Sequence, residues 1–350
     1  MIQRQRYLDK LINKKENGMV KVITGIRRCG KSYLLFEIYR EYLKSIGVDE
    51  DHIIALALDD DENIRYRNPL ELGQYIRSLL VDKDKMYYVF LDEIQKVATI
   101  PNPYVPGGDE KVGFVDVLLG LMKIKNIDLY VTGSNSKMLS SDILTEFRGR
   151  GDEIRVNPLS YREFYDAHGE DKRHAWRDYF TYGGMPLVLL QRTSQDKSKY
   201  LHDIMARHKI SYDKYVLDDL LDIVASSVGS LTNPIKIANT FSSWKGLSVT
   251  NDTIGKYLDY FIDAFMLYKA KRYDVKGRKQ IGSPLKYYYS DVGLRNARLN
   301  FRQQEENHIM ENIIYNELRG RQFSVDVGVV YGRDVSAKGQ SVRVPREIDF

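Results

Sequence analysis

The sequence predicts an α/β protein whose first 160 residues form a parallel β-sheet with helices on both faces. Short β-branched runs, typical of buried strands, alternate with helical patterns up to residue 156. A glycine-containing segment at residues 25–32 leads directly from the first strand into a helix. Beyond Pro158 long helical patterns replace the strand-like runs. A chain of 350 residues with such a change is expected to contain two to four structural units.

Each element of the predicted core follows from its local pattern. Residues 1–15 carry Tyr7, Leu8, Leu11 and Ile12 at helical spacing, which predicts a short amphipathic helix. A proline- and glycine-rich loop, 98–111, follows the third strand and is either a lid or a tolerated surface insertion. The buried strands are predicted at 19–24, 53–58, 87–91, 129–132 and 153–156, and the helices at 31–45, 69–80 and 113–123.

The second half of the chain has a different pattern. Residues 161–182 and 197–224 are predicted to be helical. Two further helices, 234–244 and 252–264, are joined by a short turn that offers Thr250 or Asn251 as an N-cap. Strand-like stretches around residues 276–278 follow and predict a basic β-hairpin. Two helices, a turn and a basic hairpin are typical of a winged helix-turn-helix.

Composition narrows the class of protein. Hydrophobic residues make up 43% and charged residues 29% of the chain, as in globular proteins. No apolar run approaches the roughly 20 residues of a membrane span, and the charged amino terminus lacks a secretory signal. The single cysteine excludes an internal disulfide, and together with six histidines at no metal-binding spacing it excludes a zinc site. We therefore expect a cytoplasmic protein with no membrane partner.

Residues 25–32 carry the strongest chemical signal, a full match to G-x-x-x-x-G-K-[ST]. Successive backbone N–H groups can wrap a phosphate only where glycines allow the turns, and the following helix directs its positive end at the anion. This pattern predicts ATP as ligand, with Lys31 on the terminal phosphates and the Ser32 hydroxyl on Mg²⁺. The expected nucleotide contacts are Gly25, Ile26, Arg27, Arg28, Cys29, Gly30, Lys31, Ser32 and Tyr33.

A second signal follows the third predicted strand, where Asp92 and Glu93 come directly after five apolar residues. Asp92 is positioned to hold the Mg²⁺ shell, and Glu93 to polarise the attacking water as general base. The strand at 53–58 lies between the two motifs in sequence, which fits ATPases whose two key strands are not neighbours. After the next strand, Ser134 or Asn135 can sense the γ-phosphate, although a simple turn or N-cap explains them nearly as well.

Two arginines, Arg148 and Arg150, are candidates for stabilising charge during phosphoryl transfer. They can act in cis or across a subunit boundary, and the second alternative requires a homo-oligomer. A solvated basic turn is the competing interpretation.

Basic residues gather between residues 266 and 302, where ten Lys or Arg face two acids and five tyrosines are interleaved. Such a segment suits the phosphate backbone of double-stranded DNA. A tyrosine-rich sheet edge protected by lysines explains it equally well. The candidate nucleic-acid contacts are Lys271, Arg272, Lys276, Arg278 and Lys279.

The motifs together resemble prokaryotic AAA+-like P-loop ATPases that carry a C-terminal restriction-endonuclease-like domain of unknown function. The matching stretches span nearly the whole chain: 22–32, 90–95, 132–136, 158–164, 183–186, 253–258 and 286–291. The resemblance implies a P-loop ATPase core at 1–160, a helical lid at 161–230, a winged helix at 231–300 and a partial nuclease-like module at 301–350.

In that last module residues 311–318, which begin with Glu311, resemble the first helix of the family's nuclease-like domain. Residues 346–350, which include Asp349, resemble its acidic strand. The next expected strand, with a second acid and a Lys or Gln, is missing from residues 1–350, so these two residues are expected to be vestigial and the chain to lack nuclease activity.

Two functional hypotheses result. In the first, the protein binds and hydrolyses ATP and couples its nucleotide state to DNA binding through the winged helix. In the second, it is a nucleotide-dependent switch whose winged helix and C-terminal module bind a protein partner.

Overall fold

The computed structural model describes residues 2–105, 107–134, 150–169, 171–206, 214–277, 279–302, 305–335 and 341–349. The chain divides into two compact units, Met1–Val156 and Asn157–Phe350, each described by itself below.

The first unit is built on a five-stranded sheet in the order β2-β3-β6-β1-β7, and every pairing in it is parallel. All five predicted strands are therefore confirmed. Strand β6 lies between β1 and β3, so the strand before the glycine loop and the strand before the acid pair are not neighbours, as expected. The bounds are β1 Val20–Thr24, β2 Ile53–Ala57, β3 Tyr87–Asp92, β6 Ile127–Thr132 and β7 Gly151–Arg155.

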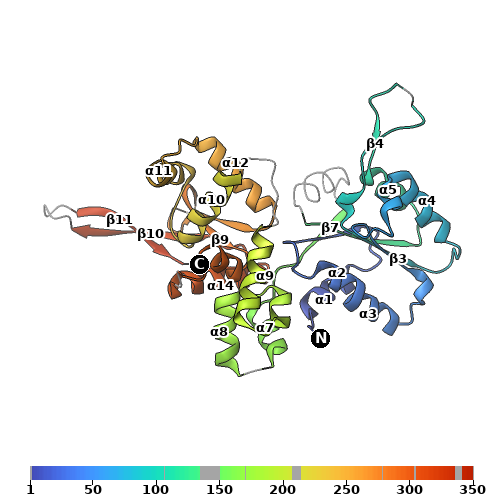
Figure 1. Ribbon diagram of the computed structural model, residues 1–350, viewed down its shortest axis with the longest axis horizontal. Coiled ribbons are helices and arrows are strands. Elements are labelled where there is room, and N and C mark those ends of the chain that lie inside the picture. Colours follow the sequence, from blue (N-terminus) through green and yellow to red (C-terminus); the bar gives the residue numbers. More distant parts are fainter. Residues whose placement is uncertain are drawn as a thin grey trace. The chain divides into compact units, whose positions relative to one another are not determined.

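Helices cover both faces of this sheet (Figure 1). Because side chains alternate along a strand, one set, including Val22, Val89 and Val131, packs against α4 and α5 in a single apolar core. The opposite set meets the helix that follows the glycine loop, where the ring of Tyr39 lies 5.0 Å from that of Tyr130. The helices are α1 Gln5–Lys14, the continuous run α2 Lys31–Tyr33, η1 Leu34–Tyr39 and α3 Arg40–Ser45, then α4 Pro69–Leu79 and α5 Phe114–Leu121.

Shorter elements connect these. The segment predicted as a loop at 98–111 contains a two-stranded antiparallel hairpin, β4 Ile100–Pro101 with β5 Lys111–Val112. Three single-turn helices complete the unit: η2 Glu50–His52, η3 Ile64–Arg67 and η4 Ile94–Lys96.

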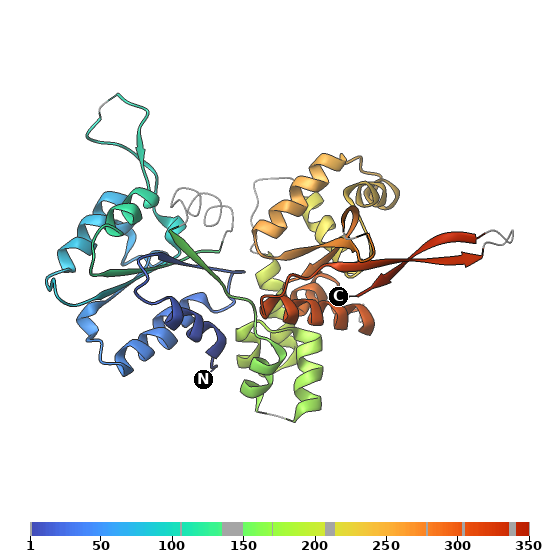
Figure 2. The same ribbon diagram turned by 180° about the vertical axis from the view of Figure 1, so that it is seen from behind.

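The second unit contains a four-stranded sheet in the order β11-β10-β8-β9. Strands β8 and β9 form the predicted antiparallel hairpin, and β10 joins β8 in parallel. Beyond that contact β10 and β11 continue as an antiparallel ribbon, drawn in red in Figure 2. The bounds are β8 Leu267–Asp274, β9 Lys279–Tyr289, β10 Val327–Val335 and β11 Ser341–Ile348.

Helices of the second unit pack around one short helix, α13, which contacts α8, α9 and α10. Because α13 packs on the helices of 161–226, and β10 shares a sheet with β8, continuous structure crosses the boundaries expected at 230 and 300. The finer division into modules stays a prediction. The helices are α7 Tyr161–His168, α8 Lys172–Tyr182, η6 Pro186–Leu190, α9 Ser194–Ala206, α10 Lys214–Ser226, α11 Pro234–Lys245, α12 Asn251–Asp263, α13 Val292–Arg298 and α14 Glu306–Gly320.

Asp291 fixes the position of α13. Its fully buried carboxylate accepts hydrogen bonds from the backbone N–H of Gly184 at 2.6 Å and of Leu294 at 3.0 Å. Gly183 has a φ of 71°, and a side chain there would come within 2.2 Å of this carboxylate. Glycine at 183 is therefore required by the close approach to Asp291, and glycine at 184 by the carbonyl oxygen of Leu159, which a side chain there would meet at 2.2 Å. Among the residues that the structure describes, no helix is long and apolar enough to cross a membrane.

Candidate functional site

The glycine loop leaves the carboxyl end of β1 and closes on the start of the following helix. Gly25 has a φ of 142°, and a side chain there would meet the carbonyl oxygen of Val156 at 2.1 Å. Gly30, with a φ of 97°, is the N-cap of the helix and supplies no side-chain cap. The first backbone N–H groups of the helix therefore have no side-chain acceptor from the cap residue, which leaves an anion-binding helix start.

Lys31 lies against this loop. Its side chain is 4% exposed, and its Nζ donates hydrogen bonds to the carbonyl oxygens of Gly25 at 3.0 Å and Ile26 at 3.2 Å. Two carbonyl dipoles thus hold the ammonium group inside the loop. An ammonium group has three N–H donors, so Lys31 can serve the loop and an anion together.

The two predicted acids follow each other at the end of β3 but have different surroundings. Asp92 is 5% exposed, and its carboxylate accepts a hydrogen bond from the hydroxyl of Thr132, the last residue of β6. The same hydroxyl oxygen accepts the backbone N–H of Glu93 at 3.1 Å. One side chain on β6 therefore holds the Asp92 carboxylate and the backbone of Glu93 at the end of the neighbouring strand.

Glu93 has an unusual backbone conformation. Its φ of 52° and ψ of 50° place it in the left-handed region, which is uncommon for a residue other than glycine. Its Oε2 accepts a hydrogen bond from the side-chain amide of Gln95, and the Ser134 hydroxyl lies 3.5 Å from the same oxygen. This conformation ends the extended backbone of β3 at Asp92 and makes Glu93 the N-cap of η4.

All of these groups meet at one edge of the sheet. Since β1, β3 and β6 are parallel and adjacent in the order β3-β6-β1, their carboxyl ends lie together. That edge carries the glycine loop with Lys31 and Ser32, the Asp92–Glu93 pair, and Ser134. A cationic loop beside a buried carboxylate fits a phosphate chain with a divalent cation, and Ser32 and Asp92 are the oxygen ligands that would hold Mg²⁺.

Other predicted loop residues have varied surroundings. Ile26 and Cys29 are buried, and the Cys29 Sγ lies 3.3 Å from the carbonyl oxygen of Val156, so these side chains anchor the loop. Arg27 is exposed, Tyr33 is 38% exposed, and Arg28 takes a left-handed φ of 68°. Their predicted contribution to nucleotide binding is through the backbone.

Of the two candidate arginines, the structure describes Arg150, and its position is not at this edge of its own chain. Arg150 immediately precedes β7, and its carbonyl oxygen accepts the N–H of Val20 at the start of β1. It therefore lies at the amino edge of the sheet, one strand length or roughly 15 Å from the glycine loop. Of the alternatives for Arg150, a role in cis does not fit this geometry. Arg148 and Asn135 lie outside the described residues.

Comparison with known proteins shows the family and the fold of this chain. The family model of an AAA domain matches residues 17–165. A Haemophilus influenzae protein described as uncharacterized is 33% identical over 348 residues, covering 96% of this chain and 83% of its own length. This chain belongs to the family of that protein and carries an AAA domain.

Two further likenesses extend the comparison. An uncharacterized protein of Methanocaldococcus jannaschii is 27% identical over 342 residues, covering 89% of this chain and 69% of its own length. A solved Walker-type ATPase of Pyrococcus abyssi has a TM-score of 0.58 at 15% identity, covering 85% of this chain and 96% of that one. At that identity the likeness concerns the fold alone. Outside the AAA domain, a domain family of unknown function matches residues 173–305.

Beyond the AAA domain, burial divides the basic segment 266–302. Lys271 and Lys276 are exposed and remain available to a polyanion. Arg272, predicted as a contact, is 9% exposed, and Lys286 and Arg295 are also buried. Such side chains do not form part of an open basic surface. Arg278 and the side chain of Lys279 lie outside the part of the chain that the structure describes.

Lys286 instead binds Glu311 and Asp349, the two acids predicted in the nuclease-like module. From β9 its Nζ donates hydrogen bonds to Glu311 Oε1 at 2.7 Å and Asp349 Oδ1 at 2.9 Å, and it lies 2.5 Å from Glu347 Oε1. The Tyr288 hydroxyl also donates to Glu311, at 2.6 Å. Burial disfavours the charged amine, but the hydrogen bonds to three carboxylates raise the pKa of Lys286 above its ordinary value. Glu311 and Asp349 therefore share one cation, the ammonium group of Lys286.

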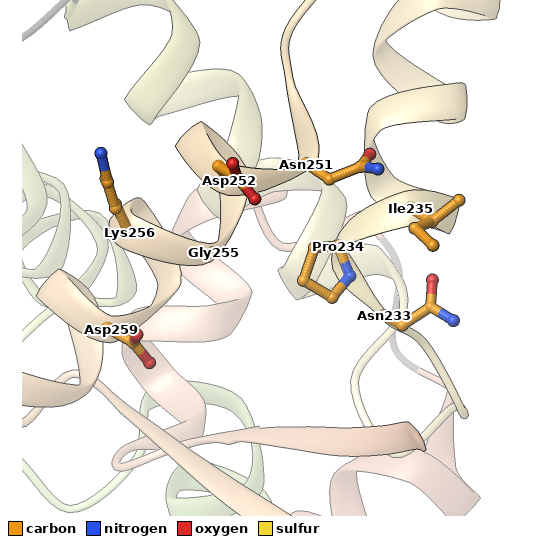
Figure 3. Close-up of a pocket in the computed structure, with 8 residues that line it drawn as sticks. All are labelled: Asn233, Pro234, Ile235, Asn251, Asp252, Gly255, Lys256 and Asp259. Carbon is orange, nitrogen blue, oxygen red and sulfur yellow. The ribbon is translucent and has the colours of Figure 1, made fainter. Parts of the chain in front are cut away.

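A pocket of about 550 Å³ lies between the first turns of α11 and α12 (Figure 3). Gly255 lines it with no side chain, and the exposed Ile235 forms part of its apolar wall. Charged groups from α12 complete it. The lining residues are Asn233, Pro234, Ile235, Asn251, Asp252, Gly255, Lys256 and Asp259.

Four residues of these clusters have contacts that no local sequence pattern indicates: Thr132, Gln95, Lys286 and Glu347. Thr132 and Gln95 belong to stretches that carry the family resemblance, and Lys286 was counted with the basic segment. The partners of Thr132, Lys286 and Glu347 lie on other elements, and that of Gln95 is Glu93 at the start of the same turn, so the structure gives these residues their roles.

Proposed function

We propose that this protein binds ATP with Mg²⁺ and hydrolyses it at the carboxyl edge of the AAA-domain sheet. The observation that carries the proposal is the Thr132 hydroxyl at the end of β6, which holds Asp92 and the backbone of Glu93 at the end of β3, while β6 pairs on its other side with β1, the strand that leads into the Lys31 loop. An acid pair with a purely structural role would not require a cationic, glycine-containing loop on the other side of β6.

Each residue of the site has a defined part in this reaction. The first backbone N–H groups of the helix and the ammonium group of Lys31 bind the terminal phosphates. They donate hydrogen bonds to the phosphate oxygens. Ser32 and Asp92 hold the magnesium ion, which would neutralise charge on the phosphates when bound. Glu93 orients the attacking water and removes its proton as general base. Ser134, which lies close to the Glu93 carboxylate, is the group proposed to sense the γ-phosphate.

Substitution of Glu93 by Gln tests the proposal. The variant keeps the size and the hydrogen-bonding ability of the side chain but cannot accept a proton. We expect it to bind ATP with unchanged affinity and to hydrolyse it roughly 10²- to 10⁴-fold more slowly. Calorimetry and a phosphate-release assay measure the two quantities. Hydrolysis at the wild-type rate would show that Glu93 is not the base.

We further propose that nucleotide state is coupled to the binding of double-stranded DNA. Helices α11 and α12 and the hairpin β8–β9 follow one another in the order of a winged helix. The exposed Lys271 and Lys276 lie on β8 and at the hairpin turn, and Arg278 and Lys279 adjoin them in sequence. Clustered cations on such a hairpin support contact with phosphates of a duplex.

The test is duplex affinity, followed by fluorescence anisotropy between about 50 and 200 mM salt, with ATP and with ADP. Each lysine that contacts a phosphate should reduce the log–log salt slope by about 1 when replaced by Ala. Lys271→Ala and Lys276→Ala are the variants, and Lys199→Ala, an exposed lysine on α9, is the matched control. Binding that is absent, or independent of salt, contradicts the DNA proposal.

A second candidate is a protein partner, and one observation favours it. The exposed side of α12, which a winged helix would insert into the major groove, carries Asp252 and Asp259 against Lys256. Carboxylates facing phosphates are unfavourable, whereas an acidic helix beside the apolar Ile235 suits a basic protein surface. A partner that is captured only in one nucleotide state, together with no duplex affinity at low salt, would favour this candidate.

Assembly is the remaining part of the proposal. Because Arg150 is distant from the Lys31 loop of its own chain, an arginine contribution from that residue requires a neighbouring subunit. Solution mass with and without ATP tests this. If the protein is a homo-oligomer, Arg150→Ala should lower turnover, and if it is a monomer Arg150 has no such role.

A further inference from the structure

Gln95 lies in the single turn η4, directly after the acid pair. Ile94 and Val97 are buried at 0% and 5% exposure and anchor this turn to the core. The backbone N–H of Lys96 donates to the Glu93 carbonyl oxygen at 2.8 Å, which closes the turn on Glu93. The Gln95 side chain is thereby directed at the Glu93 carboxylate, and its Nε2 donates a hydrogen bond to Oε2.

The orientation of the Gln95 amide follows from its neighbour. An ionised carboxylate only accepts hydrogen bonds, so the amide must present its nitrogen and not its oxygen to Glu93. Its own Oε1 is buried and has no hydrogen-bond partner among the described residues. A buried acceptor without a partner costs on the order of 1–3 kcal/mol. Folding alone gives no reason for glutamine here, because an apolar side chain of similar size would avoid that cost.

The backbone of Glu93 is also held in an uncommon conformation. Its left-handed φ of 52° is maintained by the hydrogen bond from its N–H to the Thr132 hydroxyl. Backbone strain and an unsatisfied buried oxygen thus occur within three residues of each other. Both features lower the stability of the folded protein. Such features occur most often at functional sites, where the surrounding structure holds the residues in an unfavourable conformation.

We propose that Gln95 is a positioning residue for Glu93 in the proposed hydrolysis of ATP. Its amide occupies Oε2 of the carboxylate and fixes the rotation of the carboxylate plane. The other oxygen, Oε1, then faces the position of the attacking water in a single orientation. Gln95 acts through Glu93 and does not itself exchange protons. The inference rests on the function proposed above.

Gln95→Leu and Gln95→Met test it, because both keep the volume and remove the amide. Since misplacement of a general base by about 1 Å costs roughly 10²-fold, we expect turnover to fall tenfold to a hundredfold. ATP affinity should stay within about twofold. The thermal midpoint should be unchanged or higher, because the unpaired oxygen is removed. Gln74→Leu, an exposed glutamine on α4, is the matched control and should leave all three values unchanged.

The decisive measurement is the effect of Gln95→Leu in a Glu93→Gln background. With excess enzyme over labelled ATP, slow residual rates can be compared in a single turnover. If Gln95 acts through Glu93, it has no further effect once the base is gone, and the two losses are not additive. An equal loss in both backgrounds, or wild-type turnover in Gln95→Leu while Glu93→Gln is slow, would overturn this inference alone. An inactive wild-type protein would overturn the proposed ATPase function as well.

Discussion

The hydroxyl of Thr132 donates a hydrogen bond to the carboxylate of Asp92 across two neighbouring parallel strands. It also accepts the backbone N–H of Glu93, at 3.1 Å. A side chain with one donor and two lone pairs can satisfy both partners at once. The Asp92 carboxylate and the backbone of Glu93 are therefore both held by a residue of β6.

Removing this hydroxyl should impair catalysis more than folding. Thr132→Val keeps the branched shape but leaves the buried Asp92 carboxylate without its donor, at a cost of about 1–3 kcal/mol. We expect a tenfold to hundredfold lower ATPase rate. Thr132→Ser retains the hydroxyl and should stay near the wild-type rate. Steady-state phosphate release compares the two, and equal rates for Val and Ser would contradict the role given to the hydroxyl.

Lys31 is expected to be required for ATP binding. In the structure its ammonium group is held by the Gly25 and Ile26 carbonyl oxygens, and Lys31→Ala removes the charge directed at the phosphates. Titration calorimetry at millimolar magnesium should then give no heat of ATP association. Lys44→Ala, on the exposed surface of the same helical run, should bind as the wild type does. ATP affinity retained in Lys31→Ala would sink the assignment of the loop.

Lys286 is expected to stabilise the second unit. Replacing it with Met leaves Glu311, Glu347 and Asp349 facing one another without their cation. Breaking a buried pair in this way typically costs about 3–5 kcal/mol. Urea denaturation measures the loss. Lys271→Met, at an exposed position on the adjacent strand, should change stability by less than about 1 kcal/mol.

The pH dependence of the Lys286 contribution has a defined sign. Because its pKa is raised in the folded state, the stabilisation is fully present below the ordinary value of 10.5 and is lost only as pH rises above it. Between pH 6 and 9 the loss in Lys286→Met should therefore be constant. A loss that varied steeply in that range would argue against a charged lysine.

Asp291 is expected to make the protein less stable as pH rises from about 4 to about 6. Burial raises the pKa of Asp291 from 3.8 to about 6, against the opposing effect of its backbone hydrogen bonds. In this window the folded state binds the proton and the unfolded state releases it, so stability is greatest below pH 4. The full effect is about 3 kcal/mol, from 1.36 kcal/mol per pH unit.

Asp291→Asn provides the comparison, since an amide does not titrate. Its absolute stability should fall, because one N–H donor loses its acceptor. The difference in unfolding free energy between the two proteins should shrink from pH 4 to pH 6. Parallel curves over that range would show that Asp291 does not titrate there.

The sequence by itself determined the nucleotide loop, the acid pair and the parallel sheet between them. Residues 25–32 and 92–93 are local patterns, because glycine turns, a helix start and the end of an apolar strand are each encoded within a few neighbouring residues. The same holds for α11, α12 and the hairpin β8–β9. The strand that separates β1 from β3 is β6, which follows both motifs in sequence, so the position of residues 53–58 did not by itself determine this order.

Only the tertiary structure decided which side chains meet. Thr132 lies 40 positions from Asp92 in sequence, and Lys286 lies 25 from Glu311 and 63 from Asp349. A charge count cannot distinguish the buried Arg272 and Lys286 from the exposed Lys271, because burial depends on which face of a strand is covered. Arg150 lies at the edge of the sheet opposite the glycine loop. It precedes the amino end of β7, whereas the loop follows the carboxyl end of β1, and these two strands are parallel. Contacts of this kind depend on strand order and packing, which no local pattern specifies.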